Sequence, residues 1–574
     1  MASFDGVQDM GGGLVLGPVK DDCKPVVIGI DFGTAYSGIA FAYKADPGTI
    51  QCGAPTAIDV TQMKVPTALL QLEDGTWEFG YAAESKYNEI IMSHNAEPGA
   101  PIPAHLYKRF KMVLKDATKG FDTLTAVSIA GKPHSLMELI VITLRKLKDF
   151  AMEKVTSGFG SELLPKRDVQ WVLTVPAIWN EFGKSFMRRA AFKAGLMDTE
   201  QSSNLILVLE PEGAALAVHV GAAQHGLLGV TSRFMVLDCG GGTVDITVHE
   251  VTGVNPLAMK AISVPTGGDW GGDYVNIEFK KFLKELLGPE LYREKEAPHE
   301  FYMINCEFDK VKMNFDPAGQ PGNLRLVDVL ENKKDLVGLV EAYNLNHPDK
   351  PVLINPTLRN GFLTMSKELM LSFFEPFLKQ TVQETRKVTL ELKNIRHIMV
   401  VGGFGSSKVL TERIRAEFHN KLGVRVIMPD NRPKPQGAIV HGAVYFGLHK
   451  DIIQSRLAAY TYGIAVQEDG VDECFSVLVQ KGEELPSDHE ASMGGIPADP
   501  EQTAMSWRVY RSDKTNPTTV EGEHLLGRLR VDCPSDPVPS NRRQKGVFKF
   551  GGSEIRVTVE NALGSVFESE ISMV

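Results

Sequence analysis

The chain has 574 residues, of which 43% are hydrophobic and 23% are charged, and its formal net charge is −10. This length predicts several domains or lobes with large apolar cores. The negative charge argues against a nucleic-acid partner, because binding to phosphate backbones needs clustered cations. The longest apolar runs, such as Leu205–Leu209, are too short to span a bilayer, and the six cysteines form no CxxC pair. We therefore expect a cytoplasmic protein with neither nucleic acid nor membrane among its partners.

The first predicted elements are a tail and a hairpin. Residues 1–24 are polar, contain Gly11-Gly-Gly13 and lack the apolar segment of a signal peptide, so they predict a flexible N-terminal tail. Val26–Asp31 and Ile39–Tyr43 are short apolar runs on either side of a glycine-containing turn. They predict two strands of a hairpin.

A second hairpin is expected farther along the chain, from Phe234–Asp238 and Thr243–Val251. After Gly271-Gly272, apolar residues recur at helical spacing. His397–Val401 then predicts a strand, and Ser407–Phe418 predicts the helix that follows it. The alternation of short strands with long helices is typical of an α/β fold.

The character of the sequence changes after Leu448. Short alternating strands separated by Gly, Pro, Ser and Asp are expected, and no long helix. Residues 484–504 and 532–545 are expected to be loops. The predicted strands are Ser506–Tyr510, Arg528–Val531, Gly546–Phe550 and Glu554–Val559. The expected division is thus a tail (1–24), an α/β unit (25–448), a linker (449–459) and a β-rich domain (460–574).

Three apolar runs lead into glycine-rich turns: Ile28–Ser37, Val236–Asp245 and Val400–Gly405. A glycine turn lets backbone N–H groups approach phosphate oxygens closely. Asp31 and Asp238 end the first two strands, and an aspartate in that position can hold a hydrated divalent cation. The three turns together predict a clamp for a nucleoside triphosphate.

The motifs beside these turns indicate a family. They are Thr174-Val-Pro-Ala177, Leu209-Glu-Pro211, Gly267-Gly-Asp-Trp-Gly-Gly-Asp273 and Gly402-Gly403. With both hairpins, they resemble the 70-kDa heat-shock protein family within the actin-like ATPase superfamily. Some details are similar to its divergent 12A/12B-like branch: Phe110-Lys-Met112, Gly442-Ala-Val-Tyr-Phe-Gly447 and Thr461-Tyr-Gly463.

This resemblance implies an α/β fold: a two-lobed actin-like ATPase with duplicated ribonuclease H-like lobes, followed by a small β-sandwich-like domain. Leu525–Leu529 and Ser553–Val559 resemble the second half of the family's substrate-binding sandwich. The sequence given stops at Val574, directly after the last predicted strand, so no helical lid is expected. Peptide capture without a lid should be fast and weak, because nothing covers the bound segment.

The resemblance also implies roles for single residues. Asp31 and Asp238 match the two aspartates that hold Mg²⁺ through water; turn capping is the alternative. The catalytic residues would be Lys111, Glu210, Asp238, Thr243 and Asp245. The nucleotide would contact Asp31, Gly33, Thr34, Ala35, Tyr36, Gly240, Gly241, Gly242, Gly268, Glu307, Lys310, Gly402, Gly403 and Phe404.

Some of these assignments have ordinary alternatives. Glu210 has a second acid beside it at Glu212, and a solvated acid in a turn would look the same. Asp245 would also fit an outward-facing strand position. Lys108 is a second candidate for the catalytic lysine, and a solvated basic helix face would explain both lysines. Lys111 is preferred because it follows an aromatic residue.

The nucleoside side departs from the family pattern. Val311 stands where an arginine is expected after the Cys-Glu-x-x-Lys pattern, and Phe404–Ser407 contains no arginine that would stack on the base. Lys312 or Phe404 can substitute by stacking. Ala35 replaces a threonine of the first turn. Nucleotide affinity is therefore expected to be weaker than in typical members.

The resemblance predicts an ATP-binding chaperone-like protein that hydrolyses ATP with Mg²⁺ and binds extended client peptides and co-chaperones. A nucleotide-dependent scaffold with little turnover is the main alternative. A small-molecule kinase of the same superfamily is a third hypothesis, which Leu525–Leu529 and Glu210-Pro211 disfavour.

Overall fold

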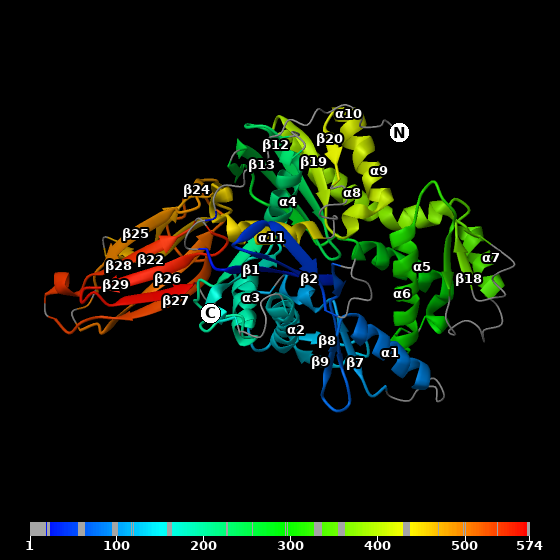
Figure 1. Cartoon of the computed structure of the whole chain (residues 1–574), viewed down its shortest axis with the longest axis horizontal. Coiled ribbons are helices and arrows are strands. Elements are labelled where there is room, and N and C mark those ends of the chain that lie inside the picture. Colours follow the sequence, from blue (N-terminus) through cyan, green and yellow to red (C-terminus); the bar gives the residue numbers. More distant parts are fainter. Residues whose placement is uncertain are drawn as a thin grey trace.

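In this computed structural model, the described part of the chain is residue 19 and residues 23–570, apart from 56–62, 95–101, 116, 119, 158–163, 225–227, 255, 293, 296, 326–335, 354–361, 429–436, 469, 498, 500, 537 and 551. The fold is mixed α/β, consistent with an actin-like ATPase fold. A block made of strands lies at one end of the molecule, on the left in Figure 1. Most of the predicted tail, residues 1–24, lies outside the described residues.

The first large sheet contains the first predicted hairpin. Strand β1 pairs with β2 in antiparallel fashion and with β10 in parallel, and every residue of β1 and β10 is buried. A sheet covered on both faces gives continuous apolar strands of this kind. The strand order is β11 (Leu205–Leu209), β10 (Val169–Val175), β1 (Val26–Phe32), β2 (Tyr36–Tyr43), β3 (Asp46–Gly53), with β4 (Val65–Pro66) paired to β2.

The second large sheet contains the second predicted hairpin. Strands β12 and β13 are antiparallel, and β19 lies parallel to β12 on its other side. Both predicted hairpins and the predicted strand at 397–401 are confirmed. The strand order is β14 (Leu257–Ala261), β13 (Val244–Val254), β12 (Arg233–Cys239), β19 (Ile395–Val401), β20 (Arg425–Ile427), with β15 (Thr266–Gly268) paired to β13.

Helices α4 (Glu210–Gln224) and α11 (Ala438–Leu448) pack between the two sheets. Alternate residues of the strands face opposite cores: Val27 packs on these helices, whereas Ile28 faces the outer core of its sheet. A Cβ at Gly442 would lie 1.7 Å from the carbonyl oxygen of Gly213, so the two helices cross at a distance that only glycine permits.

The remaining helices cover the outer faces. Helices α2 (Leu136–Ser157) and α3 (Glu181–Lys193) pack on the first sheet, and α5 (Asp273–Leu291), α6 (Pro298–Asn314), α8 (Lys367–Glu391) and α9 (Lys408–Ile414) pack on the second. The helix predicted over 407–418 is α9, which continues as a π-helical turn at Arg415–His419. Toward the lower side of Figure 1, helix α1 (Tyr81–His94) lies beside a small sheet of β5 (Ala68–Gln71), β6 (Trp77–Phe79) and β7 (His105–Lys108). On the right lies α7 (Leu336–Asn346) with a second small sheet of β16 (Gly322–Arg325), β17 (Val352–Leu353) and β18 (Phe362–Met365). Strands β8 (Thr125–Val127) and β9 (Pro133–Ser135) form a short two-stranded ribbon.

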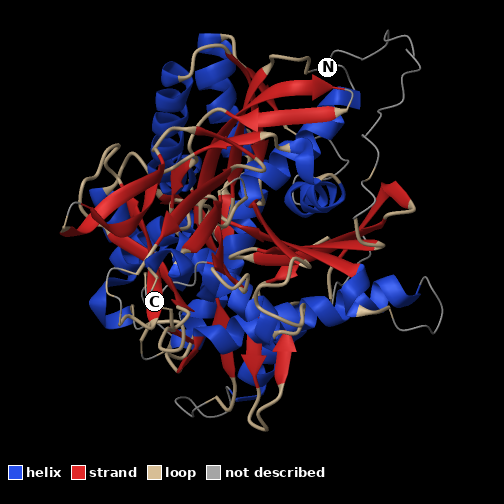
Figure 2. Cartoon of the chain, turned by 90° about the vertical axis from the view of Figure 1, so that its left-hand side faces the viewer, coloured by secondary structure: helices blue, strands red, loops and turns tan. Residues whose placement is uncertain are grey.

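The block at the end of the molecule consists of two four-stranded antiparallel sheets. They share one core, in which Trp507 lies against Phe548. In Figure 2, where all strands are red, the end of the molecule that carries this block faces the viewer. One sheet is β23 (Val471–Val479), β22 (Thr461–Glu468), β26 (Ala504–Ser512), β27 (His524–Asp532), and the other is β25 (Glu490–Gly495), β28 (Gln544–Lys549), β29 (Arg556–Asn561), β30 (Val566–Glu570).

The prediction of loops over 484–504 was wrong. Strands β24 (Glu484–Pro486) and β25 lie in that range, paired with β21 (Ser455–Leu457) and with β28. Strand β25 is an edge strand of small and polar residues whose alternate positions are exposed, so its sequence lacks the apolar signal of an inner strand. Among the described residues between β27 and β28, the structure has only the short helical turn Pro539–Arg542.

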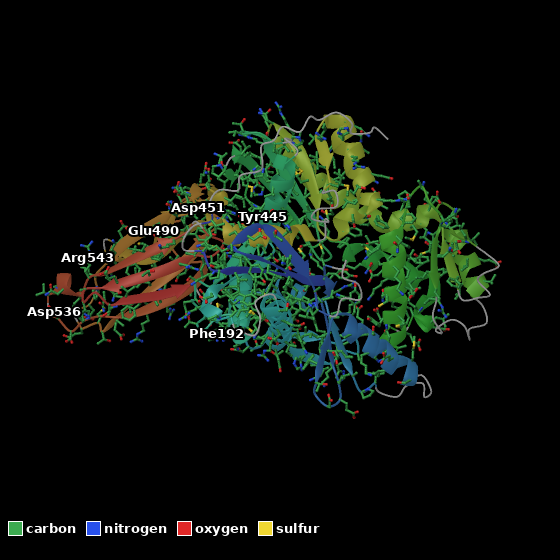
Figure 3. The ribbon with its side chains drawn as sticks, viewed as in Figure 1. Phe192, Tyr445, Asp451, Glu490, Asp536 and Arg543 are labelled. Carbon is green, nitrogen blue, oxygen red and sulfur yellow. The ribbon has the colours of Figure 1, made fainter. Side chains whose placement is uncertain are left out.

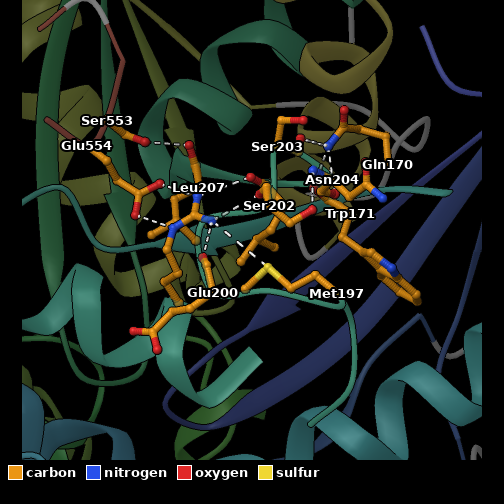
Figure 4. A network of polar contacts seen from close by, with 12 residues as sticks. Gln170, Trp171, Met197, Glu200, Ser202, Ser203, Asn204, Leu207, Ser553 and Glu554 are labelled. Atoms are coloured by element: carbon orange, nitrogen blue, oxygen red, sulfur yellow. Dashed lines mark hydrogen bonds and ion pairs between the residues drawn. The ribbon is translucent and has the colours of Figure 1, made fainter. Parts of the chain in front are cut away.

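The β-block contacts the first sheet and helix α3 through polar groups that are largely buried. The guanidinium of Arg188 on α3 donates to both carboxylate oxygens of Glu554, at 2.7 and 2.5 Å, and the hydroxyl of Ser553 donates to the carbonyl of Leu207 at 2.5 Å (Figure 4). Arg456 of β21 pairs with Glu212 of α4 at 2.6 Å. The segment between the α/β part and the block is therefore held against both. In Figure 3, Asp451 lies at this junction, while Asp536 and Arg543 lie toward the far end of the block.

Within the described residues, no helix combines the length and the apolar character needed to cross a membrane.

Candidate functional site

The turns of the two hairpins face each other across a cavity of about 340 Å³. A Cβ at Gly241 would lie 2.8 Å from the Cβ of Ala35, and one at Gly242 would lie 3.0 Å from the hydroxyl of Thr34. The turns thus approach as closely as glycine allows. Of the predicted site residues, the cavity is lined by Asp31, Gly33, Thr34, Ala35, Tyr36, Glu210, Asp238, Gly240, Gly241, Gly242, Thr243, Gly402, Gly403 and Phe404.

Glycine is required at two places in this lining. A Cβ at Gly33 would lie 2.3 Å from the carbonyl oxygen of Tyr36. Gly402 has φ +85°, and its Cβ would lie 2.4 Å from an oxygen of Asp238. The third turn therefore closes directly over the end of β12. The N–H of Gly240, which was expected to donate to a phosphate, instead donates to the carbonyl of Thr243 within the same turn, at 2.9 Å.

Four carboxylates lie at or behind the floor of the cavity, and each is at most 8% exposed. Asp31, Glu210 and Asp238 line the cavity, whereas Asp245 lies behind the lining. Burial and the neighbouring carboxylates raise the pKa of Asp238 well above its usual range. Its Oδ1 is buried and has no hydrogen-bond partner among the described residues. Asp31 accepts a hydrogen bond from the hydroxyl of Thr174 at 3.1 Å. This concentration of negative charge needs cations.

Two lysines enter the carboxylate cluster. The ammonium of Lys111, which is 2% exposed, donates to Oε1 of Glu210 at 2.7 Å. Burial raises the pKa of Glu210, and Lys111 opposes that shift. Lys64 lies 2.5 Å from Oδ2 of Asp31. Lys108 instead pairs with Glu84 at 2.6 Å on the rim of the cavity. The geometry brings Lys111, and not Lys108, to the carboxylates.

Asp245 joins the two sheets. Its Oδ1 accepts the backbone N–H groups of Ala177 and Ile178, which follow β10, at 3.0 and 3.2 Å. Burial and then the charge of Glu210 raise the pKa of Asp245 to about 7, although the hydrogen bond from Thr243 opposes the shift. Asp245 is 1% exposed, so it is not an outward-facing strand residue.

Three predicted contacts lie away from the cavity lining. Glu307 and Lys310 pair with each other at 2.6 Å, and the side chain of Lys310 is 70% exposed. Gly268 lies in β15 beside the ring of Trp270, which a Cβ there would strike at 1.9 Å. In this conformation none of the three lines the cavity. The spacing of a helical motif does not determine how far its side chains lie from an opposing turn.

Other residues occupy that side of the cavity. The ammonium of Lys312 lies 5.8 Å from the ring centroid of Phe404, and both residues line the cavity. Arg109, which has a positive φ of 58°, reaches across to Asp273 at 2.9 Å. The sequence pointed to Lys312 as a substitute for the absent arginines, but Lys64 and Arg109, which also line the cavity, were not predicted as site residues. No local sequence signal marks Lys64, because its position depends on the pairing of the short strand β4 with the start of β2.

No protein-family model matches the chain. It is 27% identical to Heat shock 70 kDa protein 12A of Homo sapiens over 93% of this chain and 89% of that protein. It is 27% identical to Heat shock 70 kDa protein 12B of Homo sapiens over 93% of this chain and 88% of that protein. Its identity to Chaperone protein DnaK of Thermosipho melanesiensis is 25%, over 90% of this chain and 74% of that protein. The resemblance read from the motifs is thereby confirmed: the homologues of the chain are 70-kDa heat-shock proteins, and they include the divergent 12A and 12B branch.

Proposed function

We propose that the chain is an ATP-binding, chaperone-like protein that holds ATP with Mg²⁺ between the two hairpin turns and hydrolyses it slowly. The observation that carries the proposal is the pair of facing glycine turns, with Asp31 and Asp238 at the strand ends beneath them. Backbone N–H groups in such turns bind phosphate oxygens. The third turn, at Gly402 and Gly403, lies on the same cavity and would face the nucleoside.

The residues at the floor fit a hydrated cation. Asp238 has a buried oxygen without a hydrogen-bond partner among the described residues, and its pKa is raised by burial and then by the repulsion of the surrounding carboxylates. A divalent cation beside Asp31 and Asp238 would relieve that repulsion, and Mg²⁺ usually keeps several of its waters. When bound, Mg²⁺ would supply charge neutralisation for the phosphates.

The chain's own side chains would then position the reacting groups. Lys111 donates to Glu210, and its buried ammonium would stabilise the charge that develops on a transferred phosphoryl group. Asp245 is fixed by two backbone N–H groups, and with a pKa of about 7 it can take a proton from a water molecule at neutral pH. Thr243 adds a hydroxyl at the second turn. These roles remain proposals for Lys111, Glu210, Asp238, Thr243 and Asp245.

The finer architecture is part of the same proposal. The two large sheets share the order of a hairpin beside parallel strands, which supports two lobes of duplicated, ribonuclease H-like design over 25–448. Residues 449–459 would be the linker, and 460–574 a β-sandwich-like domain that binds extended client peptides. Hydrolysis would change the contact between these units through the buried pair of Arg456 and Glu212. A cytoplasmic location and co-chaperone partners belong to this proposal.

A scaffold with little turnover is the second candidate. The departures on the nucleoside side favour it: Lys312 and Phe404 occupy that wall, while Glu307 and Lys310 pair away from it. Steady-state ATP hydrolysis by the full chain separates the two. The chaperone-like ATPase predicts turnover that depends on Mg²⁺ and is lost in Asp238→Asn. Nucleotide binding without turnover would support the scaffold, and no binding at all would refute both.

A further inference from the structure

Lys64 is a largely buried cation that none of the predicted roles includes. Its side chain is 12% exposed and lines the same cavity as the two glycine turns. The residue immediately precedes β4, whose Val65 and Pro66 pair with Ser37 and Tyr36 at the start of β2. The turn that forms one wall of the cavity therefore also fixes the backbone of Lys64.

The stem of Lys64 is packed against the same hairpin. A Cβ at Gly38 would lie 3.0 Å from Cγ of Lys64 and 2.4 Å from the carbonyl oxygen of Met63. The chain therefore passes over β2 at a position where only glycine leaves room, and the ammonium is directed to Asp31 at 2.5 Å. The packing of its stem and the ion pair with Asp31 therefore hold Lys64 in place, unlike a solvated surface lysine.

Negative charges outnumber positive ones around Lys64. Lys111 is already paired with Glu210, whereas Lys64 is the lysine that faces Asp31. Its charge also acts on Asp238 and lowers the pKa of that carboxyl against the effect of burial. A polyphosphate entering the cavity would meet the buried carboxylates of Asp31, Glu210 and Asp238, so its binding needs positive charge that can move with it.

We propose that Lys64 is a phosphate-binding residue that partly replaces the divalent cation, so that the chain binds ATP when Mg²⁺ is absent. This inference rests on the proposed function. The flexible stem and compact ammonium of lysine allow the group to turn from Asp31 to a phosphate oxygen. When Mg²⁺ is present, the same movement of Lys64 would free Asp31 to contact the water molecules bound to that ion. The same lysine thus serves both states of the site.

The test is titration calorimetry of ATP into the full chain, with Mg²⁺ and with EDTA at constant ionic strength. Wild type is expected to lose less than about tenfold in affinity on removal of Mg²⁺. Lys64→Met keeps the length of the stem but not the charge, and it should lose at least about tenfold more than wild type in EDTA. Tenfold corresponds to about 1.4 kcal/mol. Lys64→Arg should keep the behaviour of wild type.

The matched control is Lys86→Met. Lys86 is an exposed lysine of α1 that pairs with Glu89 at 3.2 Å, and its loss should leave both affinities unchanged. If wild type fails to bind ATP even with Mg²⁺, the proposed function fails. If wild type binds with Mg²⁺ but loses more than about a hundredfold in EDTA, only the role of Lys64 is overturned. That result needs no variant, so it decides the question even where Lys64→Met does not fold. Equal ratios for wild type and Lys64→Met would also overturn it.

Discussion

Removing the carboxylate of Glu554 should loosen the contact between the β-block and the first sheet. Arg188 is 2% exposed and forms two hydrogen bonds to this carboxylate (Figure 4). Breaking a buried pair by removing one partner typically costs about 3–5 kcal/mol, because the other charge stays buried. Arg188 keeps three carbonyl acceptors, at Glu200, Ser202 and Leu205. We therefore expect Glu554→Ala to lower the free energy of unfolding by about 2–3 kcal/mol.

Calorimetric unfolding of the full chain measures this cost, and limited proteolysis reports where the chain opens. Glu473→Ala is the matched control, because Glu473 pairs with Arg508 on the surface of the same block. An exposed pair contributes at most about 1 kcal/mol, so this variant should stay near wild type. If Glu554→Ala also stays within about 0.5 kcal/mol of wild type, a level typical of ordinary surface substitutions, the pair does not hold the block and the reasoning is refuted.

Thr243→Ala should slow ATP turnover but change nucleotide binding only a few fold, because it removes one hydroxyl and no backbone donor; loss of binding in calorimetry would contradict this. The preference for ATP over GTP in competition should be below about a hundredfold, or 2.7 kcal/mol, because neither Val311 nor residues 404–407 supply the arginine expected to stack on the base; a larger preference would contradict this account of the nucleoside side. Residues 1–448 expressed alone should fold and bind nucleotide, and their failure to fold would remove the boundary at 449–459. Burial lowers the pKa of His249 to about 4. The unfolded chain then binds the extra proton between pH 6.5 and 4, so stability falls as the pH falls through that window. His249→Asn should reduce the loss of unfolding free energy between pH 7.5 and 5.5 by about 1 kcal/mol, whereas a variant of the exposed His419 should not; equal losses in wild type and His249→Asn would contradict the assignment.

The sequence predicted the parts of the fold whose signal is local. Both hairpins are apolar runs around glycine turns, and the strands at 26–31 and 234–238 are buried as expected. The edge strand β25 was missed because its small and polar residues carry no apolar alternation. Strand β21 was missed for a different reason: its pairing depends on β24, which lies 27 residues farther along the chain, counted between their ends at 457 and 484.

The same distinction applies to the site. Asp31 and Asp238 follow from the strand ends, and Lys111 follows from a motif that the geometry supports. Lys64 was not predicted, because its position depends on how β4 pairs with the first turn. Glu307 and Lys310 have the expected spacing, but the placement of α6 directs them to each other. Tertiary contacts, which a single sequence does not display, decide these cases.

Hydrogen–deuterium exchange with and without ATP tests the central claim most directly, because it locates the nucleotide on the chain. The account predicts slower exchange at residues 33–37, 240–243 and 402–404 when ATP and Mg²⁺ are added, since these three turns would close on one ligand. Exchange that slows elsewhere and leaves these turns unchanged would show that the cavity between the hairpins is not the nucleotide site.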